Sequence, residues 1–357
     1  MSIRFRSSCT EPQARGQEFG QQYAAKIRGS VLCYQALFDR VAGREVDLLA
    51  LGAQALDAIA AFAPPLHREI LGMAEGAGLD ARLIGAINAR TEILALLGAQ
   101  LRGECSTVVK IDPFSDAPVT VQTWDWYADF AEQWLVWEIP HADGSHTTTV
   151  TEFGIVGKAG VNSRGLGLHF NILHHRHDGQ RIGVPVHVAA RWLLDTQRDV
   201  NQALQLLSAA NVSASSSLTL VASADNASTA VSVELHPGGP GLVFPHEDGL
   251  LVHTNHFLSS PACQFDTEPA QYPDTLVRYD QLLRRLRGRP GLRAGDILAA
   301  MSSHLGSTGA VCCHPDSSLP EAGQYATLAS ILLDVKNGTL QALRGGPCRH
   351  AQLFGAV

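Results

Sequence analysis

The spacing of apolar residues changes once along this chain, close to Arg102-Gly103, and that change limits the fold more than any other feature. Residues 11–100 are rich in Ala, Leu, Gln and Glu, with apolar residues at helical spacing and no extended alternation. After residue 103 the apolar residues alternate with a period of two, which is typical of strands, and helical spacing returns only from Pro185. Helical and strand sequence in separate blocks predicts an α+β layered fold.

The same spacing predicts individual elements. The predicted helices are 48–62 (ended by Pro64-Pro65), a helix through Ile70 and Met73 (ended by Gly76 and Gly78), 79–101, 185–195, 200–209, 274–286 and 294–303. The predicted strands are 107–111, 119–124, 134–139, 147–151, 218–222, 230–235, 250–254, 327–335 and 340–343. The glycines between 154 and 167 predict tight turns and close backbone approach.

Composition excludes several classes of protein. Hydrophobic residues make up 45% of the 357 residues and charged residues 17%, which fits a compact globular chain rather than a disordered one. The net charge of -7 and the lack of a basic run argue against a nucleic-acid partner. No apolar stretch is long enough to span a membrane, and the start, Met1 to Arg6, has no apolar core after its charges. With seven cysteines, an odd number, we expect reduced thiols in a cytoplasmic protein.

Cys105 stands where helical sequence gives way to strand sequence. A cysteine in that place is either a small buried residue that opens a strand or a nucleophile. A thiol is intrinsically nucleophilic and slightly ionised at neutral pH. If such a cysteine became the first residue of a chain, its own α-amine, with a pKa of about 7.7–8.0, could act as its general base.

Several short motifs stand out along the chain. They are Asn88-Ala89-Arg90-Thr91-Glu92, Gly-Glu-Cys-Ser-Thr at 103–107, Thr123-Trp124-Asp125, the stretch 151–158, Asn162-Ser163-Arg164-Gly165, Gly183-Val184-Pro185, the stretches 252–256 and 326–330, and Gly346-Pro347-Cys348. In this order they resemble the isopenicillin-N (acyl-CoA:6-aminopenicillanic acid) acyltransferase family of N-terminal nucleophile (Ntn) hydrolases, over almost the whole chain from about Arg15 to Cys348. Each motif is weak alone, but their order is specific.

The resemblance implies an αββα four-layer sandwich preceded by a helical segment, made as an inactive precursor that cuts itself at Glu104–Cys105. Residues 1–104 would then form a helical fragment, which stays as a partner of the catalytic core, residues 105–357. Attack of the Cys105 thiol on the Glu104 carbonyl would form a thioester, and water would release the first fragment. The expected activity is hydrolysis of a small N-acyl amide through a thioester acyl-enzyme.

The resemblance also assigns supporting residues. Asn255, at the end of a predicted strand, matches the family's oxyanion asparagine, and a fixed donor of this kind stabilises a tetrahedral intermediate. Asp125 matches a site carboxylate that orients the new amine or the substrate. As ordinary residues, Asn255 and Asp125 would each close a strand at a turn.

Further site residues are predicted close to these. Thr107 matches a family threonine that positions the cut, and alternation places Ser106 on the opposite face of the strand. Ser216 matches a family serine, with an uncertain register because Ser215 and Ser217 flank it. All of these are also ordinary residues of strands and loops.

One departure from the family concerns substrate choice. Gln324 and Tyr325 stand where the acyltransferase has a Ser-Arg pair, and neither replaces a guanidinium that clamps a carboxylate. Hydrolysis is therefore the first prediction, with an acyl-CoA-dependent N-acyltransferase as the alternative and a non-catalytic binding protein as a more distant one.

The sequence predicts no cofactor and no metal site. His174, His175 and His177, and the pair His253 and His256, lack a third ligand at zinc spacing. Cys312-Cys313 are expected to be core or loop thiols. The predicted partners are the small amide substrate and the cleaved N-terminal fragment; a homo-oligomer is left open.

Overall fold

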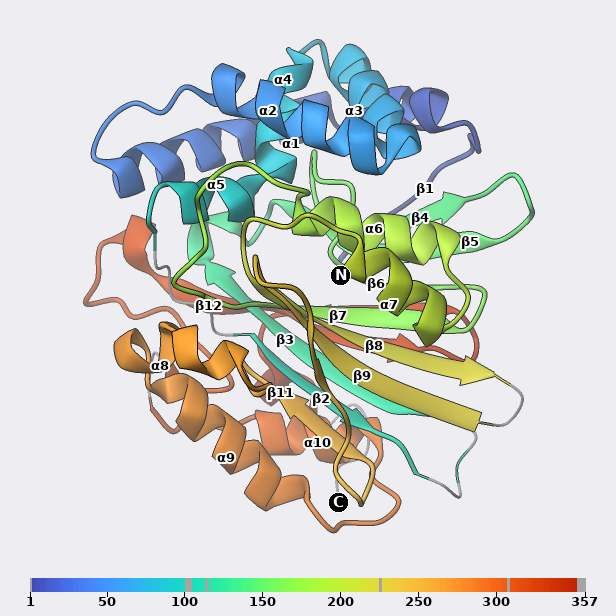
Figure 1. Cartoon of the computed structure of the whole chain (residues 1–357), viewed down its shortest axis with the longest axis vertical. Coiled ribbons are helices and arrows are strands. Elements are labelled where there is room, and N and C mark those ends of the chain that lie inside the picture. Colours follow the sequence, from blue (N-terminus) through green and yellow to red (C-terminus); the bar gives the residue numbers. More distant parts are fainter. Residues whose placement is uncertain are drawn as a thin grey trace.

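The chain begins with a short strand and a layer of helices (Figure 1). The computed structural model describes residues 2–99, 105–112, 115, 117–224, 227–306 and 309–351. The first elements are β1 (Ile3–Arg6), α1 (Pro12–Ala42), α2 (Leu48–Phe62), α3 (Pro64–Ala77), α4 (Ala81–Asn88) and α5 (Arg90–Leu96). Side chains cap the starts of α1 and α2: Glu11 accepts a hydrogen bond from the Ala14 backbone, and Asp47 accepts one from the Ala50 backbone.

Two predictions for this helical layer were wrong in detail. The single helix expected from 79 is two helices, because the chain departs from helical geometry at Ala89. The Asn88 amide there donates to the carbonyls of Ile84 and Gly154, 2.9 and 2.8 Å away. Gly76 does not end α3: a Cβ there would lie 2.3 Å from the Gln17 carbonyl, so the glycine lets α1 and α3 pack backbone to backbone. The predicted end of the helix at Leu101 lies outside the described residues.

Two sheets follow. The eight-stranded sheet has the order β1, β4 (Trp134–Pro140), β5 (His146–Glu152), β6 (Ala159–Asn162), β7 (Leu166–Ile172), β8 (Ser216–Ala224), β9 (Ala227–Leu235), β10 (Gly241–Val243). The five-stranded sheet has the order β11 (Leu250–His253), β2 (Ser106–Lys110), β3 (Val119–Tyr127), β12 (Tyr325–Asp334), β13 (Thr339–Arg344). All pairs are antiparallel except β1 with β4, which is parallel.

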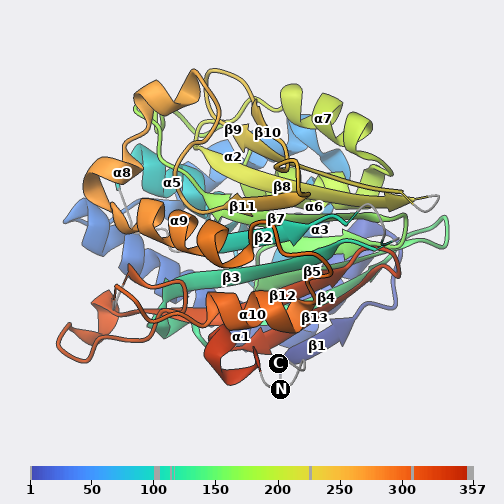
Figure 2. The same ribbon diagram turned by 90° about the horizontal axis from the view of Figure 1, so that it is seen from below.

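The sheets pack face to face between two layers of helices (Figure 2). Hydrogen bonds cross the space between them: the Thr107 hydroxyl donates to Asn171, 2.7 Å away, and His253 bonds Glu234, 2.8 Å away. Helices α6 (Val186–Thr196) and α7 (Val200–Ser208) cover the eight-stranded sheet. Helices α9 (Asp274–Leu286) and α10 (Ala294–Met301), preceded by the short α8 (Glu268–Gln271), cover the other. The two sheets between layers of helices therefore confirm the predicted αββα four-layer α+β fold.

Candidate active site

Cys105 lies at the start of β2, between the two sheets, and is only 5% exposed. Its backbone carbonyl accepts hydrogen bonds from two buried side chains, the Asn171 amide at 3.0 Å and the Arg278 guanidinium at 3.1 Å. Asn171 comes from the facing sheet and Arg278 from α9. The residue is thus held from both neighbouring layers.

Asp125 lies beside Cys105 on the neighbouring strand β3 and is buried. The backbone N–H of Asp125 favours the thiolate form of Cys105 and so acts to lower the pKa of the thiol. The Thr123 hydroxyl joins the two strands, because it accepts from the Ser106 N–H at 3.2 Å and donates to the Asp125 carboxylate at 3.3 Å. The structure therefore brings together these two predicted site residues.

Asn255 follows β11 and is connected to Cys105 through a third residue. Its side-chain oxygen accepts a hydrogen bond from Arg278, 3.0 Å away, and its amide nitrogen donates to the Ile172 carbonyl at 2.9 Å. The Thr275 hydroxyl accepts a hydrogen bond from the backbone N–H of Asn255, 2.9 Å away. A side-chain amide carries two hydrogens, so Asn255 can donate a second bond to an oxyanion.

The sequence analysis missed two residues that contact Cys105, Asn171 and Arg278, of which Arg278 makes the larger number of contacts in the candidate site. Arg278 is 1% exposed and bonds the Cys105 carbonyl, the Ser106 hydroxyl and Asn255. One signal was available: Arg278 shares the buried face of α9 with Thr275 and Leu282, at helical spacing. An arginine at a core position of an amphipathic helix has to satisfy its charge in the interior.

Ser106 and Thr107 point to opposite sides of β2. The Ser106 hydroxyl accepts a hydrogen bond from Arg278 at 3.1 Å, on the side of α9. The Thr107 hydroxyl donates to Asn171 and accepts from Gln122, 2.7 and 3.2 Å away, on the side of the other sheet. Both residues therefore support the backbone that carries Cys105.

Of the two adjacent serines that begin β8, Ser216 and Ser217, one lies on the side of Cys105. Ser217 is opposite Asn171 in the register of β7 and β8, and Ser216 is opposite Ile172. Directly opposite residues of an antiparallel pair share a face. Ser217 therefore lies on the face from which Asn171 reaches Cys105, and Ser216 on the other face.

Tyr325 begins β12 and stands across from Tyr127 on β3. The two rings lie 4.2 Å apart between centroids, and the Trp126 ring lies 6.3 Å from Tyr325. In the same register, Thr327 is the partner of Asp125. Tyr325 thus belongs to an aromatic cluster two residues along β12 from Thr327, the partner of Asp125.

A cluster of buried charged side chains, Glu152, Arg90 and Lys158, interacts with the Cys105 thiol. Glu152 contacts Arg90 at 3.4 Å and Lys158 at 3.1 Å, and it accepts a hydrogen bond from Tyr34. The Lys158 ammonium also lies 4.2 Å from the centre of the Trp124 ring. Burial, followed by the charge of Arg90, lowers the pKa of Lys158 to about 8, against the attraction of Glu152.

The thiol of Cys105 is a weak acid in this setting. Burial above all, and then the Asp125 carboxylate, raise its pKa to about 11, although Lys158 and Arg278 favour the thiolate. At neutral pH the sulfur is therefore protonated and needs a base before it can attack.

A small pocket lies close to the candidate site, although neither Cys105 nor Asn255 lines it. Its lining includes Ile172, whose carbonyl bonds Asn255, together with Trp126 and residues of α5. Its volume of about 20 Å³ holds little more than one water molecule. Glu104, the residue predicted before the cut, lies outside the described residues.

Three of the histidines without zinc spacing, His174, His253 and His256, contact different partners. His174 bonds Glu268 at 2.5 Å, and His253 bonds Glu234 at 2.8 Å. His256 is 3.0 Å from the Thr275 hydroxyl. These contacts position loops around Asn255.

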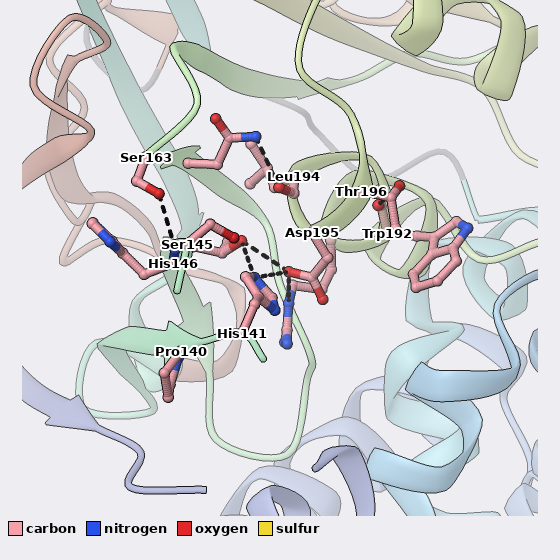
Figure 3. A network of polar contacts seen from close by, with 12 residues as sticks. Pro140, His141, Ser145, His146, Ser163, Trp192, Leu194, Asp195 and Thr196 are labelled. Atoms are coloured by element: carbon pink, nitrogen blue, oxygen red, sulfur yellow. Dashed lines mark hydrogen bonds and ion pairs between the residues drawn. The ribbon is translucent and has the colours of Figure 1, made fainter. Parts of the chain in front are cut away.

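A second buried polar network lies at the far side of the eight-stranded sheet (Figure 3). Asp195 accepts hydrogen bonds from Thr147 at 2.9 Å and Arg191 at 2.8 Å, and His141 lies 2.9 Å from the Thr147 hydroxyl. Although burial raises the pKa of Asp195, the charge of Arg191 lowers it well below its usual range. Despite its histidine, carboxylate and hydroxyl, this network attaches α6 to β5, since Arg191 neutralises the carboxylate.

The comparisons with known proteins agree with the motifs. The family described as acyl-coenzyme A:6-aminopenicillanic acid acyl-transferase matches residues 114–284. The family resemblance predicted from the sequence is confirmed. The 40 kDa form of acyl-coenzyme A:6-aminopenicillanic-acid-acyltransferase from Emericella nidulans is 29% identical over 232 residues, 64% of this chain and 62% of the relative.

Two solved structures are also similar. The N-acylethanolamine-hydrolyzing acid amidase orthologue of Caenorhabditis elegans has a TM-score of 0.47 and 11% identity, covering 67% of this chain and all of its own. The penicillin V acylase of Agrobacterium tumefaciens has a TM-score of 0.45 and 15% identity, covering 67% of this chain and 83% of its own. None of the described helices combines the length and apolar character needed to cross a membrane.

Proposed function

We propose that the protein is a self-processing amidohydrolase whose nucleophile is Cys105, freed as the first residue of a chain. The observation that carries this proposal is the set of contacts to the Cys105 backbone: Asn171, from the facing sheet, and Arg278, from α9, both donate to its carbonyl. A residue fixed from two layers keeps its position when the bond on its amino side is cut.

The first reaction is the cut itself. The Cys105 thiol attacks the Glu104 carbonyl and its proton passes to the peptide nitrogen, which leaves as the α-amine of Cys105, so that a thioester joins the two parts. Water then attacks the thioester, releases the Glu104 carboxylate and returns the thiol. The predicted division at 1–104 and 105–357 follows from this step.

The second reaction uses the new amine. Because burial and Asp125 raise the pKa of the thiol to about 11, the sulfur requires a neighbouring base at neutral pH. An α-amine titrates at about 7.7–8.0 and so accepts the thiol proton. The thiolate attacks the substrate amide, Asn255 donates to the oxyanion, the amine product leaves with a proton, and water hydrolyses the acyl-thioester.

Mass spectrometry of the purified chain tests the first step. We expect two fragments split before Cys105, and a whole chain for Cys105→Ala. Cys263→Ala, at an exposed cysteine, is the matched control and should be cut as the natural chain is. An intact chain that hydrolyses N-acyl amines would refute the proposal.

Acyl transfer is the second candidate, favoured by the family match and by the relative from Emericella nidulans. Gln324 and Tyr325 argue against it, since the place of the family's arginine is filled by a tyrosine packed on Tyr127. Incubation with an acyl-CoA thioester and an acceptor amine discriminates the two: a hydrolase forms mainly free acid, a transferase mainly new amide.

A further inference from the structure

Four side chains with nitrogen or sulfur ligand atoms converge where the last strands of the chain begin and end. They are His304, Cys312, His314 and Cys348, and their ligand atoms all lie within 4.8 Å of one another. The His314 Nε2 atom lies 3.6 Å from each of the two sulfurs and 3.1 Å from the Nε2 of His304.

The three distances from the His314 Nε2 atom are close to the edges of a zinc coordination tetrahedron. With Zn–S of about 2.3 Å and Zn–N of about 2.0–2.1 Å, a tetrahedron has S···N edges of about 3.6 Å and an N···N edge of about 3.3 Å. Hydrogen bonding does not explain the convergence, because a neutral ring nitrogen has either one hydrogen or one lone pair. The His314 Nε2 faces three polar atoms at once.

We propose that His304, Cys312, His314 and Cys348 form a structural zinc site. Two thiolates and two imidazoles are the ligands that select zinc over Mg²⁺ or Ca²⁺. Four protein ligands close the coordination shell, which is typical of a structural ion rather than a catalytic one. Binding of Zn²⁺ releases both thiol protons, so that the ion and the two thiolates balance in charge.

The ligands come from three separate segments. His304 follows α10, Cys312 and His314 precede β12, and Cys348 lies in a short helical turn, Pro347–Arg349, after β13. A zinc ion would therefore fasten the end of the last hairpin to the segment that leads into β12. No short zinc motif exists in the sequence because only the fold brings these residues together.

The backbone around Cys312 is already built for a fixed sulfur. The Cys312 N–H donates to the Ser303 carbonyl at 3.0 Å, and Thr327, the partner of Asp125, donates to the Cys313 carbonyl at 3.0 Å. A Cβ at Gly346 would lie 2.5 Å from the Cys312 sulfur, so glycine is needed there to leave room for it.

Elemental analysis tests the site on the full chain, purified from zinc-supplemented medium without chelator. We expect about one zinc per chain, as four protein ligands hold one ion. Zinc should fall to background in Cys348→Ser and in His304→Ala, and stay unchanged in Cys263→Ser, the exposed cysteine control. Exchange with Co²⁺ should give the visible spectrum of a tetrahedral thiolate complex.

Thermal unfolding gives a second readout that does not depend on activity. A strong chelator should lower the Tm of the natural chain and leave that of His304→Ala unchanged. The proposal is overturned by metal-free protein from supplemented medium, by zinc that persists in both ligand variants, or by a Cys312–Cys348 disulfide in protein prepared with a reductant.

Discussion

Replacing Arg278 with methionine should both destabilise the fold and slow the cut before Cys105. The guanidinium is buried and donates to the Cys105 carbonyl, to Ser106 and to Asn255. Methionine keeps much of the side chain's apolar volume but leaves these acceptors without their donor. The guanidinium also pairs with the Asp274 carboxylate, 3.3 Å away on the same helix. Removing one partner of a buried ion pair typically costs about 3–5 kcal/mol because the other charge loses its partner. We therefore expect the free energy of unfolding to fall by about 3–5 kcal/mol.

Denaturant unfolding in a Cys105→Ala background measures this loss on an uncut chain. The matched control is Arg284→Met on the same helix, whose ion pair with Asp280 is exposed and 2.7 Å long. Such a surface pair contributes about 0.5 kcal/mol or less. The reasoning is refuted if both variants have the same stability, because Arg278 would then hold nothing of consequence.

The same substitution, made with Cys105 present, separates stability from positioning. Arg278→Lys keeps the positive charge but cannot donate to both Cys105 and Asn255 from one rigid fork. We expect cutting, followed by intact mass, to be slow in Arg278→Lys even at low temperature, where the variant is folded. A normal rate would mean that the charge alone is sufficient.

Three further outcomes are expected. Burial raises the pKa of Glu92 from 4.5 to about 7, so the folded state holds a proton that the unfolded state loses between these values, and the free energy of unfolding falls as pH rises through that window. Glu92→Gln should remove this fall, which is at most about 3 kcal/mol. Denaturant unfolding of both proteins at low and high pH measures it, and equal pH profiles for the natural chain and the variant would contradict the role given to Glu92. Asn255→Ala should lower kcat for amide hydrolysis about 10²–10³-fold, with Asn337→Ala, on an exposed turn, unchanged; an unaltered kcat would exclude Asn255 from the oxyanion site. Ser217→Ala should reduce activity more than Ser216→Ala, and the reverse order would favour the register taken from the family.

Much of the fold can be predicted from the spacing of apolar residues alone. The predicted helix 274–286 coincides with α9, and 48–62 coincides with α2. Strands β6 and β7 were missed because their tract, 154–167 and beyond, is rich in glycine, which weakens the alternating pattern. The tract forms strands because Gly160 and Gly167 let backbones and the facing sheet approach closely. Burial between two sheets decides the structure there, and local propensity does not reveal it.

The candidate site, like the fold, could be predicted only in part from the sequence. Motifs of a few residues predicted Cys105, Asp125 and Asn255 as site residues. Cys105 and Asn255 flank strands as expected, whereas Asp125 lies within β3 because that strand continues to Tyr127. Arg278 and Asn171 reach the site from a helix on one side and a strand on the other, so no local string contains them. Only the packing of layers brings such residues to one atom.

The strand β1 decides what a cut before Cys105 would leave behind. It extends an eight-stranded sheet by pairing with β4, and Tyr34 and Arg90 from the same segment meet Glu152 in the interior. The first fragment would therefore behave as a permanent subunit and not as a discarded leader. An affinity tag on either terminus should retrieve both pieces together, even after extensive dilution.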